Sequence, residues 1–262
     1  MALDAAAAGP GRAENRALPS LIVILSLAVL LAVWWVAASL ADSRVLPSPA
    51  AVAAAFWRDA LTGELFFHLG MTLFRVAASF LLAMVFGSII GVALGMSRQA
   101  NRFFDPWLIL FLNIPALVVI VLAYIWFGLN EIAAIGAIAV NKIPNVVVTM
   151  REGARALDRQ LAEMASVYRF GRMKTLRHVI IPQLQPYLAA SSRSGLSLIW
   201  KIALVVELLG RSNGVGFQIH LYFQLFDVAS ILAYTLAFVA VMLMIEFLLV
   251  QPLEARATRW RR

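Results

Sequence analysis

The chain of 262 residues has no cysteine and little charge, with only 14% Asp, Glu, Lys and Arg. Without cysteine it can form no disulfide, no thiolate metal site and no cysteine nucleophile. Soluble domains carry about 25% charged and about 45–50% apolar residues, whereas 62% of this chain is hydrophobic. The net charge of +8 comes from basic residues between apolar stretches, as membrane insertion requires. The composition predicts an all-α integral membrane protein in contact with lipid, with no nucleic-acid partner.

The sequence also lacks the short motifs of common catalytic and nucleotide-binding sites. It contains no G-x-x-x-x-G-K-[ST], no G-x-S-x-G, no H-E-x-x-H and no paired acidic motif. A membrane protease or lipid-modifying enzyme would need a nucleophile or metal ligands converging from several helices. We therefore predict no catalytic residue, no metal ligand and no bound cofactor in this chain.

Six apolar stretches are long enough to cross a bilayer, for which a helix needs about 20 residues. They lie at residues 21–41, 71–97, 106–127, 132–150, 187–209 and 228–250. The first is longer than the apolar core of a secretory signal, about 7–15 residues, although Ser39-Leu40-Ala41 resembles a cleavage site. We expect it to be a retained membrane helix. Residues 42–70 mix aromatics with scattered charge, which is typical of a periplasmic or interfacial segment.

The distribution of Lys and Arg gives the orientation, because cytoplasmic segments are enriched in these residues. If both ends lie inside, 15 of the 22 basic residues fall in cytoplasmic segments and three in external ones. The prediction is six membrane helices with cytoplasmic N and C termini. Residues 1–20 would form a cytoplasmic tail, 71–250 a core of five further helices, and 251–262 a basic cytoplasmic tail.

Glycine and proline mark special positions within the predicted helices. Gly87, Gly91 and Gly95 recur every four residues on one helical face, the spacing that lets membrane helices pack closely. Pro115 lies inside the third stretch, where it predicts a kink or a local break. Pro144 lies inside the fourth stretch.

Four basic residues fall within the apolar stretches. At about 1.5 Å per residue, Arg75 and Arg193 sit near helix ends, where they can reach the interface. Lys142 falls near the bilayer centre and Lys201 in its outer half. Charges at this depth face a protein interior or an aqueous path. Each lysine is thus either a substrate-pathway contact or a member of a buried ion pair or interhelical hydrogen bond.

The longest polar interruption runs from residue 151 to 186 and holds seven basic residues. Its apolar residues recur at helical spacing, with Asp158 as a candidate N-cap and Gly171 as a candidate stop. We expect two short amphipathic helices joined at that glycine, the second ended by Pro182 and Pro186. The loop is either a docking surface for a partner or a basic loop that only sets topology.

Two parts of this loop resemble a known signature. Glu163-Met164-Ala165, followed by Ile180-Ile181-Pro182, resembles the E-A-A … G … I-x-L-P signature of permease subunits of binding-protein-dependent ABC importers. Four further segments resemble the nitrate/sulfonate/taurine branch of that family: LPSP (46–49), SRQANRFFDPW (97–107), IWFGLNE (125–131) and IWKIALVVELLGRSNGVGF (199–217). The resemblance covers most of the chain.

The resemblance implies a type I importer permease that works as a homodimer in the bacterial cytoplasmic (inner) membrane. Two copies of a separate ATPase, which bind ATP and Mg²⁺, would dock on the cytoplasmic loop. A periplasmic or lipid-anchored binding protein would deliver the substrate. The chain would then be a transport subunit and not an enzyme. The implied ATPase-coupling residues are Leu161, Glu163, Met164, Ala165, Tyr168, Gly171 and Pro182.

Three residues depart from the signature. Arg169 stands six residues after Glu163, where the family has glycine, and Gly171 is the nearest glycine. Met164 replaces the first alanine, and Ile181 stands where leucine is usual. The spacing from Glu163 to Pro182 matches the family. We therefore expect the loop to dock with its bend displaced toward Gly171.

The expected function is the import of a small solute. Two lysines in the membrane favour an anion, such as a sulfonate or nitrate, in line with what the resemblance implies. The alternative from another class is a self-contained secondary transporter or channel, which would show inverted repeats and broken helices in matching positions. Pro115 and Pro144 have no counterparts inside the fifth and sixth stretches.

Overall fold

The computed structural model describes residues 17–41 and 45–252. The predicted tails, 1–20 and 251–262, lie almost wholly outside the described residues. The elements are α1 (Ala17–Ala41), α2 (Pro49–Leu61), α3 (Glu64–Met96), α4 (Arg98–Asn113), α5 (Ala116–Phe127), α6 (Glu131–Arg155), α7 (Arg159–Val167), α8 (Arg172–Thr175), η1 (Leu176–Ile180), α9 (Ile181–Gly210), α10 (Val215–Gln224), α11 (Val228–Ile245) and η2 (Glu246–Val250), where η marks a π-helical turn. The described part of the chain is almost entirely helical, as the composition predicts.

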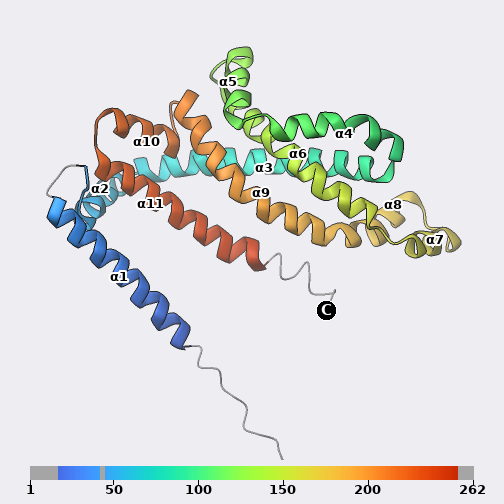
Figure 1. Cartoon of the computed structure of the whole chain (residues 1–262), viewed down its shortest axis with the longest axis horizontal. Coiled ribbons are helices and arrows are strands. Elements are labelled where there is room, and N and C mark those ends of the chain that lie inside the picture. The colour runs from blue at the N-terminus through green and yellow to red at the C-terminus, as the bar shows by residue number, and fades with distance from the viewer. Residues whose placement is uncertain (1–16, 42–44, 253–262) are drawn as a thin grey trace, which may run out of the picture.

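Helices α3, α6 and α9 form the centre of the molecule, with α3 behind the other two in Figure 1. The approach of α3 to α6 is close because glycine faces the contact three times. A Cβ added at Gly87, Gly91 or Gly95 would lie 2.6, 2.7 or 2.5 Å from the Cβ of Val146, Met150 or Ala154, respectively. Larger residues at these positions would push the two backbones apart.

The helical run after α3 is broken where the sequence predicts a break. Ile114 ends α4 in an extended conformation, Pro115 precedes α5, and the two helices meet at an angle of 94°. The proline ring disfavours helical geometry at the preceding residue, which accounts for the position of the break. Figure 1 shows α5 standing out from the bundle.

The second membrane helix begins earlier than predicted. The prediction starts it at residue 71, whereas α3 starts at Glu64, directly after Gly63 in a left-handed conformation (φ 82°). Leu65 and Leu69 are buried in the main hydrophobic core, so this first part of α3 belongs to the packed bundle. Aromatics with scattered charge indicated an interfacial segment here, but His68 is itself buried.

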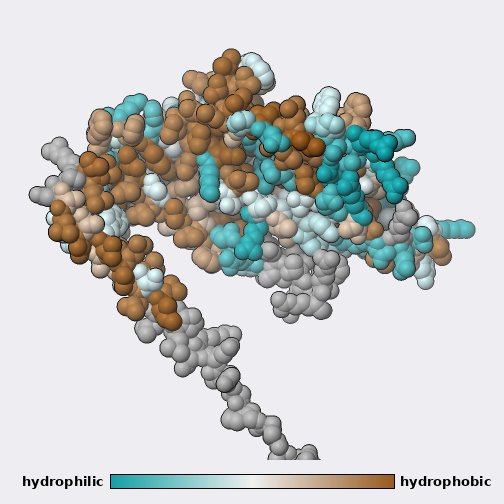
Figure 2. Space-filling model, in the orientation of Figure 1, coloured by the Kyte–Doolittle hydropathy of each residue, from teal (hydrophilic) through white to brown (hydrophobic). Residues whose placement is uncertain are grey.

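Four described helices, α1, α3, α6 and α11, are long and apolar enough to cross a membrane, and the bent pair α4–α5 would make five. Much of the outer surface is hydrophobic (Figure 2). The predicted fifth stretch lies in α9, which has 30 residues and carries Arg193, Lys201 and Glu207. Because of these charges, α9 is not among the helices that are apolar enough to cross a membrane by composition alone. It nevertheless packs along α3 and α6.

Candidate functional site

The polar loop between α6 and α9 is built around α7. Asp158 is the N-cap of this helix, as predicted, and its Oδ1 accepts a hydrogen bond from the Gln160 amide at 2.8 Å. The Asp158 amide donates in turn to Oε1 of Gln183 on α9, also at 2.8 Å. The start of α7 is therefore tied to the start of α9.

The bend after α7 lies at Arg169 and not at Gly171. Arg169 has a positive φ of 51°, and its amide donates to the Ser166 carbonyl at 3.0 Å. The Phe170 amide donates to the Ala165 carbonyl at 2.8 Å, which completes a Schellman motif. Gly171 has an ordinary extended conformation at the start of α8. The expected displacement of the bend is therefore wrong: it occurs where the family has glycine, with arginine in the left-handed position.

The second half of the loop is not a separate helix. α8 passes through the π-helical turn η1 directly into α9, and Thr175, Leu176 and Ile181 all have right-handed helical angles. Pro182 does not end a helix, contrary to the prediction, because it falls in the first turn of α9. The π-helical turn η1, in which the Ile181 amide donates to the Leu176 carbonyl, directly precedes this proline and adjusts the helical hydrogen bonds around it. Pro186 also lies inside α9 and ends no helix, contrary to the prediction. The part of the loop from α8 onward is therefore one helical run with α9.

α7 exposes much of its apolar surface. The exposed fractions are 39% for Leu161, 41% for Met164 and 70% for Tyr168. Glu163 is also exposed, at the edge of this surface. Ala165, in contrast, is only 2% exposed and packs within the chain. Val167, which the sequence reading left out, is 78% exposed beside Tyr168; its position one turn after Met164 could have identified it.

The two lysines of the predicted pathway lie in different surroundings. Lys142 is buried in the α6–α9 contact, where a Cβ added at Gly195 would lie 2.7 Å from its Cε. Lys201 is exposed on α9. Within the described part of the chain, neither ammonium has a hydrogen-bond or ion-pair partner. The structure does not bring the two lysines together.

Sequence reasoning missed a charge network that joins α3, α6 and α9. Arg75, expected at the interface, is fully buried and pairs with Glu207 at 2.6 Å and with Glu131 at 2.7 Å. Arg211 also pairs with Glu131, at 2.5 Å. These two arginines and two glutamates balance in charge. Their partners lie more than 50 residues apart along the chain, so no local spacing reveals them.

The network also holds the turn between α9 and α10 in place. Oε2 of Glu207 accepts hydrogen bonds from the Gly216 amide and the Thr72 hydroxyl, both at 2.9 Å. Gly214 has a φ of 109°, and a Cβ there would lie 2.3 Å from the Glu207 carboxyl carbon. Only glycine fits between this carboxylate and the turn. Each of the four charged side chains therefore has an ion-pair partner within the described residues, although the buried Nε of Arg211 has no hydrogen-bond acceptor.

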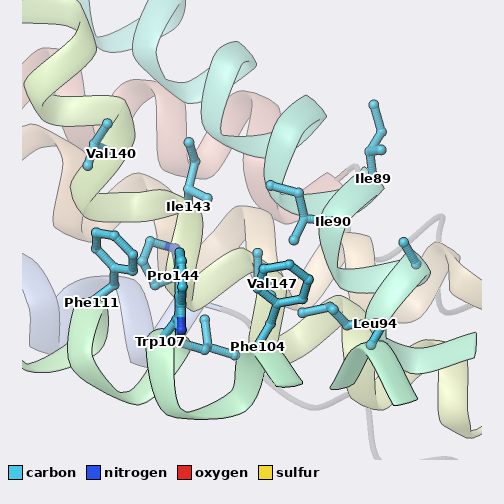
Figure 3. Close-up of a pocket in the computed structure, with 13 residues that line it drawn as sticks. Ile89, Ile90, Leu94, Phe104, Trp107, Phe111, Val140, Ile143, Pro144 and Val147 are labelled. Atoms are coloured by element: carbon cyan, nitrogen blue, oxygen red, sulfur yellow. The ribbon is translucent and has the colours of Figure 1, made fainter. Parts of the chain in front are cut away.

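A different surface is purely apolar. A groove of about 640 Å³ between α3, α4 and α6 contains side chains that include Ile90, Phe104, Trp107 and Val147 (Figure 3). It contains no charged residue and suits lipid tails or another apolar surface.

Comparison with known proteins defines the class. Residues 83–252, more than half of the chain, match the family described as "Binding-protein-dependent transport system inner membrane component". The chain belongs to this family. It is a permease subunit of an ABC importer, a multi-pass protein of the bacterial inner membrane, and a transport subunit and not an enzyme.

Individual relatives show to which branch of this family the chain belongs. The chain is 32% identical over 236 residues to the putative aliphatic sulfonates transport permease protein SsuC of Bacillus subtilis (strain 168), covering 89% of this chain and 85% of that protein. It is 29% identical over 247 residues to the taurine transport system permease protein TauC of Escherichia coli (strain K12), covering 90% and 88%. These relatives place it in the nitrate/sulfonate/taurine branch.

A bicarbonate transport system permease protein, CmpB of Synechococcus elongatus, is 29% identical over 163 residues, which cover 62% of this chain and 59% of that protein. Among solved structures, an amino acid ABC transporter crystallised with histidines aligns with a TM-score of 0.60 at 20% identity, covering 75% of this chain and 95% of that chain. This likeness supports the fold alone.

Proposed function

We propose that the chain is the membrane subunit of an ATP-driven importer, acting as a homodimer. Two copies of a separate ATPase, each with ATP and Mg²⁺, would bind α7 of the two permease copies from the cytoplasm. A periplasmic or lipid-anchored binding protein would deliver the solute from outside. Family membership supports these partners, and the concentration of basic residues in the polar loop supports its cytoplasmic location.

In this proposal each copy has six membrane helices, with both termini in the cytoplasm. α1, α3, α6 and α11 are four of them, and the bent pair α4–α5 counts as one. α9 is the remaining one, because its 30 residues span about 45 Å. It also packs along two helices that meet the length and composition of a membrane span.

The observation that carries the proposal is the construction of α7. An isolated helix of nine residues is not stable by itself, yet α7 has a capped start and a closed Schellman end. It nevertheless leaves Leu161, Met164, Val167 and Tyr168 exposed. A preformed helix with an unused apolar surface beside an exposed Glu163 is suited to a groove on a partner protein.

The same construction explains how motion would reach the membrane. α7 is tied to α9 by the hydrogen bond from Asp158 to Gln183, and α8 and η1 run into α9 without a break. A displacement of α7 by the closing ATPases would therefore move α9 and the end of α6. We propose that this movement opens the path to the outside and that hydrolysis reverses it.

Glu163→Arg tests the coupling surface. It reverses the charge at the edge of the apolar surface, so we expect loss of uptake and of the co-purified ATPase. Ser166→Arg is the matched control, because Ser166 is exposed on the opposite side of α7. This control variant should retain uptake and still co-purify with the ATPase. Normal uptake by the Glu163→Arg variant, inserted at normal levels, would contradict the proposal.

For the substrate we propose a small anion, such as a sulfonate, taurine, nitrate or bicarbonate. The names of the relatives and the unpaired ammonium groups of Lys142 and Lys201 support this class. A double substitution of both lysines by methionine should impair uptake of the anion. An unchanged uptake rate in transport assays with radiolabelled anions would remove the proposal.

A further inference from the structure

The side of α6 that faces away from α3 is polar. Val146 and Met150 of α6 meet the glycines of α3. At about 100° per residue, Asn141 and Asn145 lie about 140° around the helix from these contacts. Both asparagines are partly exposed. The Asn141 amide nitrogen donates to the Ala137 carbonyl at 2.9 Å, which leaves its carbonyl oxygen open.

α9 carries a matching polar row. Its exposed residues include Ser194, Ser197 and Lys201, which lie within an arc of about 60°. Lys201 is about 120° around α9 from Glu207, which faces α3. The row therefore also lies on the side away from α3. These two rows, Asn141 and Asn145 of α6 and Ser194, Ser197 and Lys201 of α9, together form the polar face.

The two rows lie beside each other because α6 and α9 are antiparallel. Lys142 meets Gly195 near the middle of the contact, and Gly153 meets Tyr187 toward the polar loop. This register brings Asn145 level with Ser194, and Asn141 level with Ser197. In Figure 1 this side faces the viewer, and Figure 2 shows hydrophilic patches over α6 and α9 on it.

α5 contacts α9 on the side away from the polar face. The Tyr124 hydroxyl donates to the Val206 carbonyl at 2.8 Å, and a Cβ added at Gly210 would lie 2.4 Å from the Tyr124 ring. α5 also packs against the first turns of α6, where Ala133 contributes to the contact. Val206 and Gly210 lie about 140° and 180° around α9 from Lys201, so the contact with α5 leaves the polar row of α9 open.

The chemistry of the polar face does not suit lipid. An exposed lysine within a membrane segment faces protein or water, because hydrocarbon does not solvate its charge. The buried Arg75 and Glu207 neutralise each other, whereas Lys201 has no partner in the described residues. The apolar groove of Figure 3, which includes Val140 of α6, is the contrasting surface.

We infer that the polar face lines the aqueous path of the transported anion. Lys201 attracts the anion toward the outer half of the path. The amide of Asn145 and the hydroxyl of Ser197 offer uncharged hydrogen-bond donors nearer the cytoplasm, whereas the Ser194 hydroxyl donates to the Ser191 carbonyl at 3.3 Å. This inference rests on the proposed function, since it assigns the path of the solute that the importer carries.

The absence of cysteine in the chain makes the test direct. Single variants Asn145→Cys and Ser194→Cys are made in the full-length chain, with Val140→Cys as the control on the apolar side of α6. Inside-out membrane vesicles are treated with 2-sulfonatoethyl methanethiosulfonate, an anion that does not cross membranes. We expect both polar-face cysteines to react on the order of ten-fold faster than the control, since they meet water and attract anions.

A second measurement isolates Lys201. In the Ser194→Cys background, Lys201→Gln should lower the rate at which the anionic reagent modifies the cysteine several-fold. The rate with a cationic thiosulfonate reagent should not fall, because the lysine attracts only anions. Equal reaction rates at residues 145, 194 and 140 overturn the inference, as does an unchanged anion preference without Lys201. Labelling requires no ATPase, so a failure of the proposed coupling at Glu163 is distinguishable from a failure here.

Discussion

Arg75 on α3 and Glu207 on α9 form an ion pair of 2.6 Å in which neither side chain is exposed. The pair joins two helices that are separated by 132 residues in the sequence. It also connects to Glu131 at the start of α6 and to the turn before α10. A single network therefore sets the relative positions of α3, α6 and α9.

Glu207→Gln should lower the free energy of unfolding by about 3–5 kcal/mol, because it leaves the buried Arg75 charge without full compensation. Arg155→Gln is the matched control, since Arg155 and Glu152 pair at 3.0 Å with both side chains exposed. Such a pair contributes about 0–1 kcal/mol. Thermal denaturation of the purified protein in detergent measures both.

The double variant Arg75→Met/Glu207→Met sharpens this prediction. It removes both members of the pair and leaves Glu131 with Arg211, so the remaining charges are again balanced. We expect it to recover part of the stability lost in Glu207→Gln. A double variant that is less stable than the single one would show that hydrogen bonds to the turn, and not charge balance, dominate the network.

Gly91→Ala should destabilise the chain by about 1–3 kcal/mol through overpacking. The new Cβ would lie 2.7 Å from both the Met150 Cβ and the Val147 carbonyl oxygen, and the backbone contact cannot yield easily. Gly136→Ala on α6 is the control, because its Cβ would have no neighbour within 4 Å. There the gain in helix propensity should leave the melting temperature unchanged or raised. A melting temperature unchanged by Gly91→Ala would mean that α3 and α6 can separate freely.

Arg169→Gly should stabilise the end of α7. A left-handed conformation destabilises a residue that has a Cβ by about 1–2 kcal/mol. Glycine avoids this strain, but it loses more backbone entropy on folding, which offsets part of the gain. We expect slower hydrogen exchange of the Phe170 amide, which closes the Schellman motif. Gly171→Ala should leave that exchange unchanged, since φ is −66° there and a Cβ would meet nothing within 4 Å. Faster exchange in Arg169→Gly would contradict this account of the bend.

The features predicted correctly from the sequence are those with a local cause. The break at Pro115 follows from the geometry of the proline ring, and the start of α7 follows from the Asp158 cap. The bend at Arg169 was misplaced because glycine is only the preferred residue for a left-handed position. The two hydrogen bonds at the helix end hold an arginine there instead.

The features that were missed depend on contacts between distant segments. Arg75 sits near a helix end in the sequence, which made the interface a reasonable expectation. Its burial follows only from the arrival of Glu207 and Glu131 in three dimensions. The different surroundings of Lys142 and Lys201 likewise depend on how α6 and α9 face each other, which hydropathy alone does not define.

Lys142→Met should raise the melting temperature of the protein. Lys142 is 2% exposed and has no counter-ion in the described residues, so its charged form loses hydration without compensation. Methionine keeps a long unbranched side chain against Gly195, so the packing of α6 on α9 should be preserved. Lys201→Met is the control: the side chain is already exposed, and its removal should change anion uptake more than stability. If Lys142→Met instead lowers the melting temperature, the ammonium is held by a partner outside the single chain, such as the second permease copy.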